Sequence, residues 1–219
     1  MIENPKMAEL FMMSSHCMDE STLIFETQHG DLDSFNRLVL TYQDSLFNTA
    51  VRILGDDELA ADATQKAFIS AYRSIKSYRG GSFKAWLMRT VTNACYDELR
   101  RQKRQPTVSL ESCNNDDSEI ENPRWLADRG MLPEAKYEAA ELANAIQHCL
   151  DALPTDFRTV LILVDVQGMN YDEVARTIQV PLGTIKSRLA RARLRMREHL
   201  QGFHDLLPSI FHLEKENTL

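Results

Sequence analysis

The amino-acid sequence predicts an all-α protein: two small helical domains joined by a flexible acidic linker. Apolar residues recur three and four positions apart along most of the 219 residues, while the period-two alternation of a strand is nearly absent. Residues 105–132 interrupt this pattern with prolines, asparagines and a glycine, and carry two basic against six acidic residues. Such a stretch is long for a loop inside one compact domain, so it marks a domain boundary.

The first block, residues 19–104, is predicted to hold three helices separated by glycine signals. Asp31 or Asp33 can cap a helix that begins near residue 33 and is broken by Gly55 and the aspartate after it. A second helix is expected over 57–77, and Gly80 with Gly81 interrupts the pattern again. A third helix is expected over 82–103. Residues 1–18 are assigned to an N-terminal tail.

The second block, residues 133–200, shows the pattern of a helix-turn-helix. Helices are expected over 133–152 and 154–167, the second opened by Pro154. Asn170, with Glu173 three positions on, has the spacing of a capping box for a short helix that ends near residue 178. After a tight turn, Pro181 opens the last, longer helix. Residues 201–219 are assigned to a loosely ordered C-terminal tail.

Composition argues against several classes of protein. No apolar run approaches the roughly 20 residues of a membrane span, and the N-terminus lacks the basic and apolar regions of a secretion signal. Four scattered cysteines without a C-x-x-C pair indicate reduced thiols in the cytoplasm. Two His-Cys pairs lack the ligand spacing of a structural zinc site. With no phosphate-cradling loop and no nucleophile motif, we expect no catalytic site, metal or cofactor.

The last helix concentrates positive charge in a chain whose net charge is −7. Between Lys186 and Glu198, basic residues outnumber acidic ones six to one, and the helix offers no acidic partner four positions away. Ile185, Leu189 and Ala192 share the apolar stripe that faces the domain core. In a helix-turn-helix the N-terminal half of this second helix enters the major groove, so this pattern predicts DNA contact.

The helix predicted over 82–103 is also two-sided. One stripe is apolar, and the other carries cations, an amide and two aromatic rings: Trp86, Arg89, Asn93, Tyr96, Arg100 and Lys103. Stacking surfaces combined with phosphate-neutralising cations are typical of single-stranded nucleic-acid binding. Trp86 at the core edge and Tyr96 as ordinary surface would explain the same residues without DNA, so this helix indicates nucleic acid only together with the basic last helix.

Two segments resemble a known family. "DATQKAFISAYRSIKSYRGGSFKAWLMRTVTNACYDELRRQKR" is similar to domain 2 of sigma-70 factors of the extracytoplasmic-function group. "ALPTDFRTVLILVDVQGMNYDEVARTIQVPLGTIKSRLARARLRMREHL" resembles domain 4 of the same factors. The pair, in the right order and separated by an acidic linker, covers nearly all of residues 31–200. The group lacks the other domains of the larger family, which fits this length.

This resemblance implies a bacterial transcription initiation factor that binds core RNA polymerase. Domain 4 would read the minus-thirty-five promoter element through Thr184, Lys186, Ser187, Arg188, Arg191 and Arg193. Domain 2 would read and help open the minus-ten element through the polar face just described, with Asn93 near a flipped-out base and Trp86 at the melting edge. The polymerase clamp would be bound by Asp62, Gln65, Phe68, Ile69 and Tyr72.

The resemblance also implies regulation and location. Factors of this group are commonly held inactive by an anti-sigma factor, often membrane-bound, so we expect a cytoplasmic protein that joins the nucleoid when active and does not itself enter the membrane. Lys66 departs from the family, which usually has an acidic residue there. Because the chain is acidic outside its DNA-facing helices, we expect weak DNA binding until polymerase separates the domains.

Two other functions compete with this interpretation. An operator-binding helix-turn-helix regulator would explain the last helix but not the face around Trp86 and Asn93. The second, an anti-sigma factor or adaptor, would not explain the basic recognition helix. The flexible linker further predicts that the two domains vary in relative placement.

Overall fold

The computed structural model describes residues 19–104 and 133–206, and in this part of the chain every regular element is helical. The all-α prediction is therefore confirmed. The first domain contains α2 (Glu20–Gln28), α3 (Leu32–Leu54), α4 (Asp57–Ser74), the short 3-10 turn η1 (Ile75–Ser77) and α5 (Phe83–Arg104). The second contains α6 (Pro133–Asp151), α7 (Thr155–Leu161), the π-helical turn η3 (Ile162–Val166), α8 (Tyr171–Ile178), α9 (Leu182–Leu200) and the 3-10 turn η4 (Gln201–Leu206).

Local capping explains where these helices begin and end. The Asp31 carboxylate accepts the Ser34 N–H at 3.0 Å, and α3 ends at Gly55 in the left-handed conformation, φ +74°. The predicted capping box is present, because Asn170 and Glu173 each accept the other's backbone N–H. Pro154 and Pro181 are N-cap residues rather than first helical residues, one position from the prediction.

Three features differ from the sequence prediction. Helix α2 was not predicted, because its apolar residues Leu23, Ile24 and Phe25 are consecutive and show no helical period. The helix expected over 154–167 is α-helical only to Leu161. It continues to Val166 as a π-helical turn, in which backbone hydrogen bonds join residues five positions apart. The segment expected to be a loose tail begins instead with the 3-10 turn η4.

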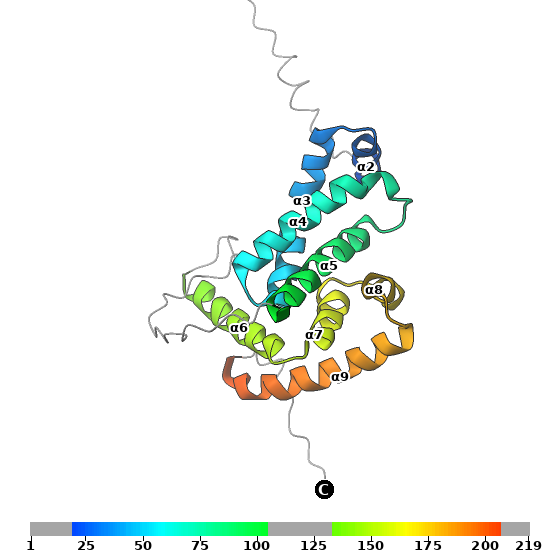
Figure 1. Cartoon of the computed structure of the whole chain (residues 1–219). Helices are drawn as coiled ribbons and strands as arrows, with labels where there is room; N and C mark the ends of the chain where they lie inside the picture. Colours follow the sequence, from blue (N-terminus) through cyan, green and yellow to red (C-terminus); the bar gives the residue numbers. More distant parts are fainter. Residues whose placement is uncertain (1–18, 105–132, 207–219) are drawn as a thin grey trace, which may run out of the picture.

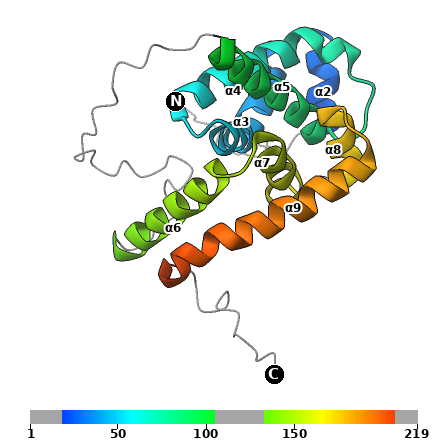
Figure 2. The ribbon, with the colours of Figure 1, turned by 60° about the horizontal axis from the view of Figure 1, so that its bottom comes forward.

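The two domains pack against each other in this structure, whereas the variation in placement expected from the linker stays a prediction. Figure 1 shows α5 lying between α4 and the pair α7–α8, and α9 closing the far side of the second domain. Figure 2 shows α6 and α9 side by side, with α3 behind α7. Helices α6 and α7 contact α3, and α8 contacts α5, so buried apolar residues of both domains form one continuous cluster. Burial of this shared apolar surface favours the packed arrangement of the two domains.

Arg158 provides a largely buried polar contact between the domains. Its guanidinium, 11% exposed, donates at 2.9 Å to the carbonyl of Ile53, in the last turn of α3. It also donates to the Asp151 carboxylate and carbonyl, both at 2.8 Å. A cation at a helix C-terminus is favourable because the unsatisfied carbonyls there carry partial negative charge. Arg158 therefore fixes the connection between α6 and α7 onto the end of α3.

A second polar contact lies next to the π-turn. The carbonyl of Gln167 accepts the Lys84 ammonium at 2.8 Å, and its side-chain oxygen accepts the Ser45 hydroxyl at 2.9 Å. Both partners belong to the first domain, on α5 and α3. None of the helices in the described ranges is both long and apolar enough to cross a membrane.

The domain contact makes Gly55→Ala an informative substitution. Any L-residue in the left-handed conformation costs about 1–2 kcal/mol, and a Cβ at Gly55 would lie 2.9 Å from the Asp151 carboxylate oxygen that Arg158 grips. We expect Gly55→Ala to lower the free energy of unfolding and to increase the radius of gyration measured by small-angle X-ray scattering.

Gly168→Ala is the matched control. Gly168 has nearly the same dihedral angle, φ +69°, but nothing lies within 4 Å of its added Cβ. We expect Gly168→Ala to lower the free energy of unfolding by about 1 kcal/mol and to keep the wild-type radius of gyration. Equal scattering profiles for both variants would show that a Cβ at Gly55 does not open the domain contact.

Candidate nucleic-acid interface

Helices α8 and α9 form the predicted helix-turn-helix. Gln179 ends α8 in the left-handed conformation, φ +57°, and the N–H of Val180 donates to the carbonyl of Ala175 at 3.1 Å. Helix α9 then buries Ile185 and Leu189 in the domain, leaving its opposite face in solvent. The turn thus fixes the direction of α9, and packing of its apolar stripe fixes its rotation.

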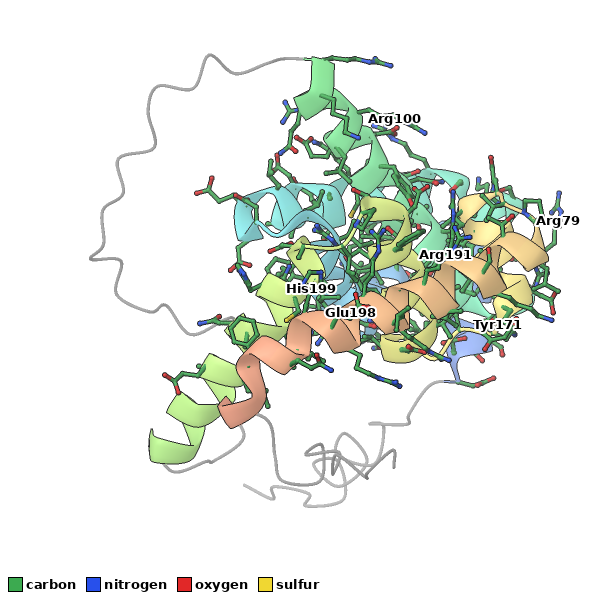
Figure 3. All side chains as sticks on the ribbon, turned by 90° about the horizontal axis from the view of Figure 1, so that it is seen from below. Arg79, Arg100, Tyr171, Arg191, Glu198 and His199 are labelled. Carbon is green, nitrogen blue, oxygen red and sulfur yellow. The ribbon has the colours of Figure 1, made fainter. Side chains whose placement is uncertain are left out.

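The solvent face of α9 presents a short row of groups able to reach a DNA groove. Lys186, Ser187 and Arg191 are exposed, and Figure 3 shows Arg191 on the outer surface of the helix. The Ser187 hydroxyl donates to the carbonyl of half-buried Thr184 at 3.0 Å. In the described residues no carboxylate lies within ion-pair distance of Lys186 or Arg191, so both are available to an external acceptor.

Three other cations of α9 are engaged by residues of the same domain. Arg188, 24% exposed, pairs with Asp156 of α7 at 2.6 Å, and Arg193 makes a bidentate pair with Asp165 of the π-turn at 2.6 and 2.9 Å. Arg195 lies over the Phe157 ring, 5.2 Å from its centroid. The sequence pattern of α9 could not predict these contacts, because both carboxylates come from residues that precede the helix.

Three aromatic rings gather at the start of α5. Trp86 stacks on Phe83 with centroids 5.4 Å apart, and Tyr78 contacts both rings. The Gln28 side-chain amide donates to the carbonyls of Ile75 and Tyr78, both at 3.0 Å, and so holds the segment between α4 and α5 in place. Trp86 is therefore half-buried on a rigid support with part of its ring accessible. Sequence analysis missed Tyr78, which precedes the paired glycines and falls outside the helical period.

The remaining predicted residues of α5 follow Trp86 along one side of the helix. Arg89, Asn93, Arg100 and Lys103 are exposed, whereas Tyr96 is half-buried. Arg100 donates to Asp97 at 3.0 Å. Burial raises the pKa of the Tyr96 hydroxyl above its ordinary value, so this group stays neutral at physiological pH.

The two candidate faces meet where α8 covers α5. A pocket at this junction is lined from the first domain by Asn93, Tyr96, Asp97 and Arg100, and from the second by Asp156, Thr177, Ile178, Gln179, Val180 and Arg188. The turn of the helix-turn-helix therefore lies over part of the polar face of α5. Figure 3 labels Arg100, which belongs to α5, and Arg191, which belongs to α9.

A third predicted surface lies on α4. Asp62, Gln65, Ile69 and Tyr72 are exposed and Phe68 is half-buried, so the five predicted polymerase contacts share the outer side of the helix. Ile69 is 45% and Tyr72 37% exposed, unusual for large apolar side chains at neighbouring positions. Tyr72 is supported by the Phe35 ring, with centroids 4.9 Å apart.

Comparison with known proteins identifies the family. Residues 38–105 match Sigma-70 region 2, and residues 143–196 match Sigma-70, region 4. A sigma factor of Mycolicibacterium smegmatis, "ECF RNA polymerase sigma factor SigE", is 34% identical over 184 residues, covering 82% of this chain and 67% of that protein. The "RNA polymerase sigma-H factor" of Pseudomonas aeruginosa is also 34% identical over 184 residues, covering 83% of this chain and 94% of that protein.

The chain belongs to the sigma-70 family, in the extracytoplasmic-function group.

A solved structure agrees with this assignment. The sigma factor RpoE from Bartonella quintana, determined in complex with the anti-sigma factor NepR, matches with a TM-score of 0.61 and 26% identity, covering 78% of this chain and 98% of that one. Region 2 spans most of α3 together with α4 and α5, and region 4 spans the helix-turn-helix. Sigma factors are promoter-specific transcription initiation factors and not enzymes, as the sequence predicted.

The described part of this sigma factor contains no cluster of side chains arranged to hold a metal ion. Cys95 and Cys149 are both fully buried. Burial raises the pKa of the Cys95 thiol from about 9 to about 12, so the reactive thiolate is scarce at neutral pH. Packing in α5, rather than redox chemistry, explains this cysteine.

The shifted pKa predicts how Cys95 responds to alkylation. At pH 8 we expect no modification of Cys95 by iodoacetamide in the folded protein and complete modification in denaturant, as followed by mass spectrometry of its peptide. The neutral thiol is favoured in the folded state, so its contribution to stability is present below about pH 9 and is lost as pH rises toward 12. Fast native-state labelling at pH 8 would show that α5 opens locally.

Proposed function

We propose that this sigma factor directs core RNA polymerase to promoters by dividing recognition between its two domains. Helix α9 would read the minus-thirty-five element, α5 would read the minus-ten element, and α4 would bind the polymerase. The observation that carries this proposal is the presence of two cation-bearing helix faces in separate sigma-70 regions. One suits duplex DNA in a groove, and the other suits an unpaired strand.

At the minus-thirty-five element, the exposed groups of α9 are matched to base edges and phosphates. Arg191 and Lys186 can donate to the O6 and N7 atoms of guanine, and Ser187 can contact either partner of a base pair. Thr184 stands at the helix start, where close approach is possible. Arg188 and Arg193 complete the predicted set, but each must exchange a carboxylate of its own domain for a phosphate. That exchange favours phosphate contacts over base contacts for these two residues.

At the minus-ten element, α5 offers a stacking ring followed by an amide. Trp86 rests on Phe83 and can present its accessible edge where the duplex separates. Asn93, two turns further on, can hydrogen-bond the edge of a base that has left the stack. Tyr96 is suited to stacking, while Arg89, Arg100 and Lys103 would neutralise phosphates.

On the polymerase side, α4 combines apolar and polar contacts. Exposed Ile69 and Tyr72 would bury apolar area, and Asp62 and Gln65 would provide directional polar contacts around them. Phe68, half-buried, would link this surface to the core of the first domain. A patch of this composition is typical of the anchoring centre of a protein interface.

The closed arrangement of the domains explains why polymerase would be needed. The turn between α8 and α9 lines one pocket with Asn93, Tyr96 and Arg100, so the second domain restricts access to this part of α5 in the free protein. Promoter elements lie tens of ångströms apart along DNA, so both faces cannot be used from one compact body. Binding to polymerase would separate the domains and expose the covered face.

Regulation by an anti-sigma factor is part of this proposal. The similar Bartonella quintana protein was solved with the anti-sigma factor NepR, and this chain shares its fold over most of its length. We propose a cytoplasmic protein that is held inactive by such a partner, tethered at the membrane in some cases, and that reaches the nucleoid after release.

Run-off transcription tests the proposed function directly. Purified core polymerase, with and without this protein, is presented with a fragmented library of the host genome. We expect discrete transcripts that require the protein and share an upstream motif, and that are lost with Asn93→Ala. Absence of such transcripts, together with specific footprints made by the protein alone, would favour an operator-binding regulator instead.

Arg191→Ala separates base reading from phosphate contact. If Arg191 reads a base, we expect a loss of about 1–3 kcal/mol at a cognate minus-thirty-five site and a smaller loss on unrelated DNA. Arg193→Ala is the control. Arg193 is already paired with Asp165 and is proposed to contact a phosphate, so this substitution should weaken binding to every DNA sequence by a similar amount. Filter binding of holoenzyme to matched and mismatched promoters measures both effects. A uniform loss for Arg191→Ala would assign it to a phosphate.

A further inference from the structure

A groove between α4 and α5 adjoins Asn93 on the side that faces away from α8. It is lined by Lys66 and Ser70 of α4 and by Thr90, Asn93, Ala94, Asp97, Glu98 and Arg101 of α5. Asn93 lines both this groove and the pocket covered by α8. Whereas residues of the second domain line one side of Asn93, the α4–α5 groove is lined by residues of the first domain alone.

A buried carboxylate organises the charges of this groove. The side chain of Glu98 is 4% exposed, and it accepts two hydrogen bonds from the Arg101 guanidinium at 2.7 and 3.1 Å. The Lys66 ammonium lies 3.8 Å from its other oxygen. A buried carboxylate needs such partners because an unpaired charge is costly away from water. Glu98 therefore holds two cations from two helices at the groove wall.

These cations remain available to an external anion. Lys66 and Arg101 are 57% and 59% exposed, so both charged groups face solvent while sharing one carboxylate. Asp97, the other acid of the groove, is paired with Arg100 at 3.0 Å. Asp62 reaches Lys66 only at 4.0 Å and is 62% exposed, so water screens that contact. The Lys66–Arg101–Glu98 cluster leaves one positive charge in excess beside the Asn93 amide.

We propose that this groove binds one nucleotide of the unpaired minus-ten strand, with Lys66 and Arg101 on its phosphate and Asn93 at its base. The inference rests on the proposed function and adds residues to it. Cations suit the backbone phosphates of a single strand, and an amide that lines the same groove can hydrogen-bond the edge of an unstacked base. Glu98 is a positioning residue in this site, because it fixes both cations without facing the solvent itself.

The inference also assigns Lys66, the residue that departs from the family pattern. Its helix carries the proposed polymerase surface, but its ammonium turns toward α5 and Glu98. Lys66 therefore belongs to the DNA side of the domain, and Asp62, its neighbour one turn earlier, belongs to the polymerase side. Once the polymerase engages Asp62, the Lys66 ammonium retains Glu98 as its carboxylate partner in this cluster and faces the strand.

The test compares Lys66→Gln, Lys66→Arg and Asp62→Asn in holoenzyme. The probe is a fork-junction DNA that carries the unpaired strand of the strongest promoter recovered by run-off transcription. Its dissociation constant is measured over a series of salt concentrations, and affinity for core polymerase is measured separately. Because Arg101 keeps its two hydrogen bonds to buried Glu98, each variant is expected to fold, with at most a small fall in melting temperature for Lys66→Gln.

For Lys66→Gln we expect a several-fold weaker fork-junction complex. One fewer phosphate contact on a single strand should reduce the slope of log affinity against log salt by about 0.7. Core-polymerase affinity should stay within twofold of wild type, and Lys66→Arg should restore the slope. Asp62→Asn should show the opposite pattern, with weaker core binding and an unchanged slope.

Two results would overturn the inference. Weaker core binding by Lys66→Gln with an unchanged slope would place Lys66 on the polymerase surface. No change in either quantity would show that the groove holds no strand. Failure of the proposed function looks different, because wild-type protein would then yield no promoter in the run-off experiment, and the inference would fall with it.

Discussion

The position of Arg158 at the end of α3 is the constraint on which the arrangement of this sigma factor depends. A largely buried guanidinium needs hydrogen-bond acceptors, and here both terminal nitrogens of Arg158 donate to carbonyls on both sides of the domain boundary and to Asp151, while its buried Nε has no partner in the described residues. This contact fixes α7, and α7 together with the π-turn supports α9. The orientation of the recognition helix relative to α5 therefore follows from a contact made far from either DNA-facing surface.

Charge pairing in the closed form explains how an acidic protein can carry two faces proposed to bind DNA. Arg188 and Arg193 of α9 and Arg100 of α5 each have a carboxylate partner. Exposed pairs of this kind contribute little to stability, so exchanging a carboxylate for a phosphate has a small free-energy cost. Lys186 and Arg191 lack such partners in the described residues. Much of the positive charge is thus masked until DNA competes for it.

The two sides of α5 differ in accessibility in the free protein. The side that holds Tyr96 and Arg100 shares a pocket with the α8–α9 turn, whereas the side next to α4 is lined by the first domain alone. Asn93 stands between them. In the proposed function, domain separation would control access to one side, while the Glu98 cluster already positions the cations of the other. Lys66 and Asp62 are one helical turn apart, so the proposed polymerase-binding surface of α4 and the proposed strand-binding groove adjoin at this cluster.

Much of this protein could be predicted from its sequence, because the relevant signals are local. The Asp31 cap, the capping box of Asn170 and Glu173, and the apolar stripe of α9 each involve residues within a few turns of one another. The sigma-70 assignment rests on motifs of the same kind. Helix α2 escaped prediction because its consecutive apolar residues carry no helical period, and its place is set by packing on α3.

Tertiary structure alone decided which charges are free and how the domains meet. The partner of Arg193 lies 28 positions away, and the Ile53 carbonyl that Arg158 holds lies 105 positions away. The two cations that share Glu98 come from different helices. An ion pair or a buried hydrogen bond depends on distance in space, which no spacing along the chain specifies. The sequence by itself therefore determined the helices, their two-sided chemistry and the family, and folding determined which of those faces the free protein exposes.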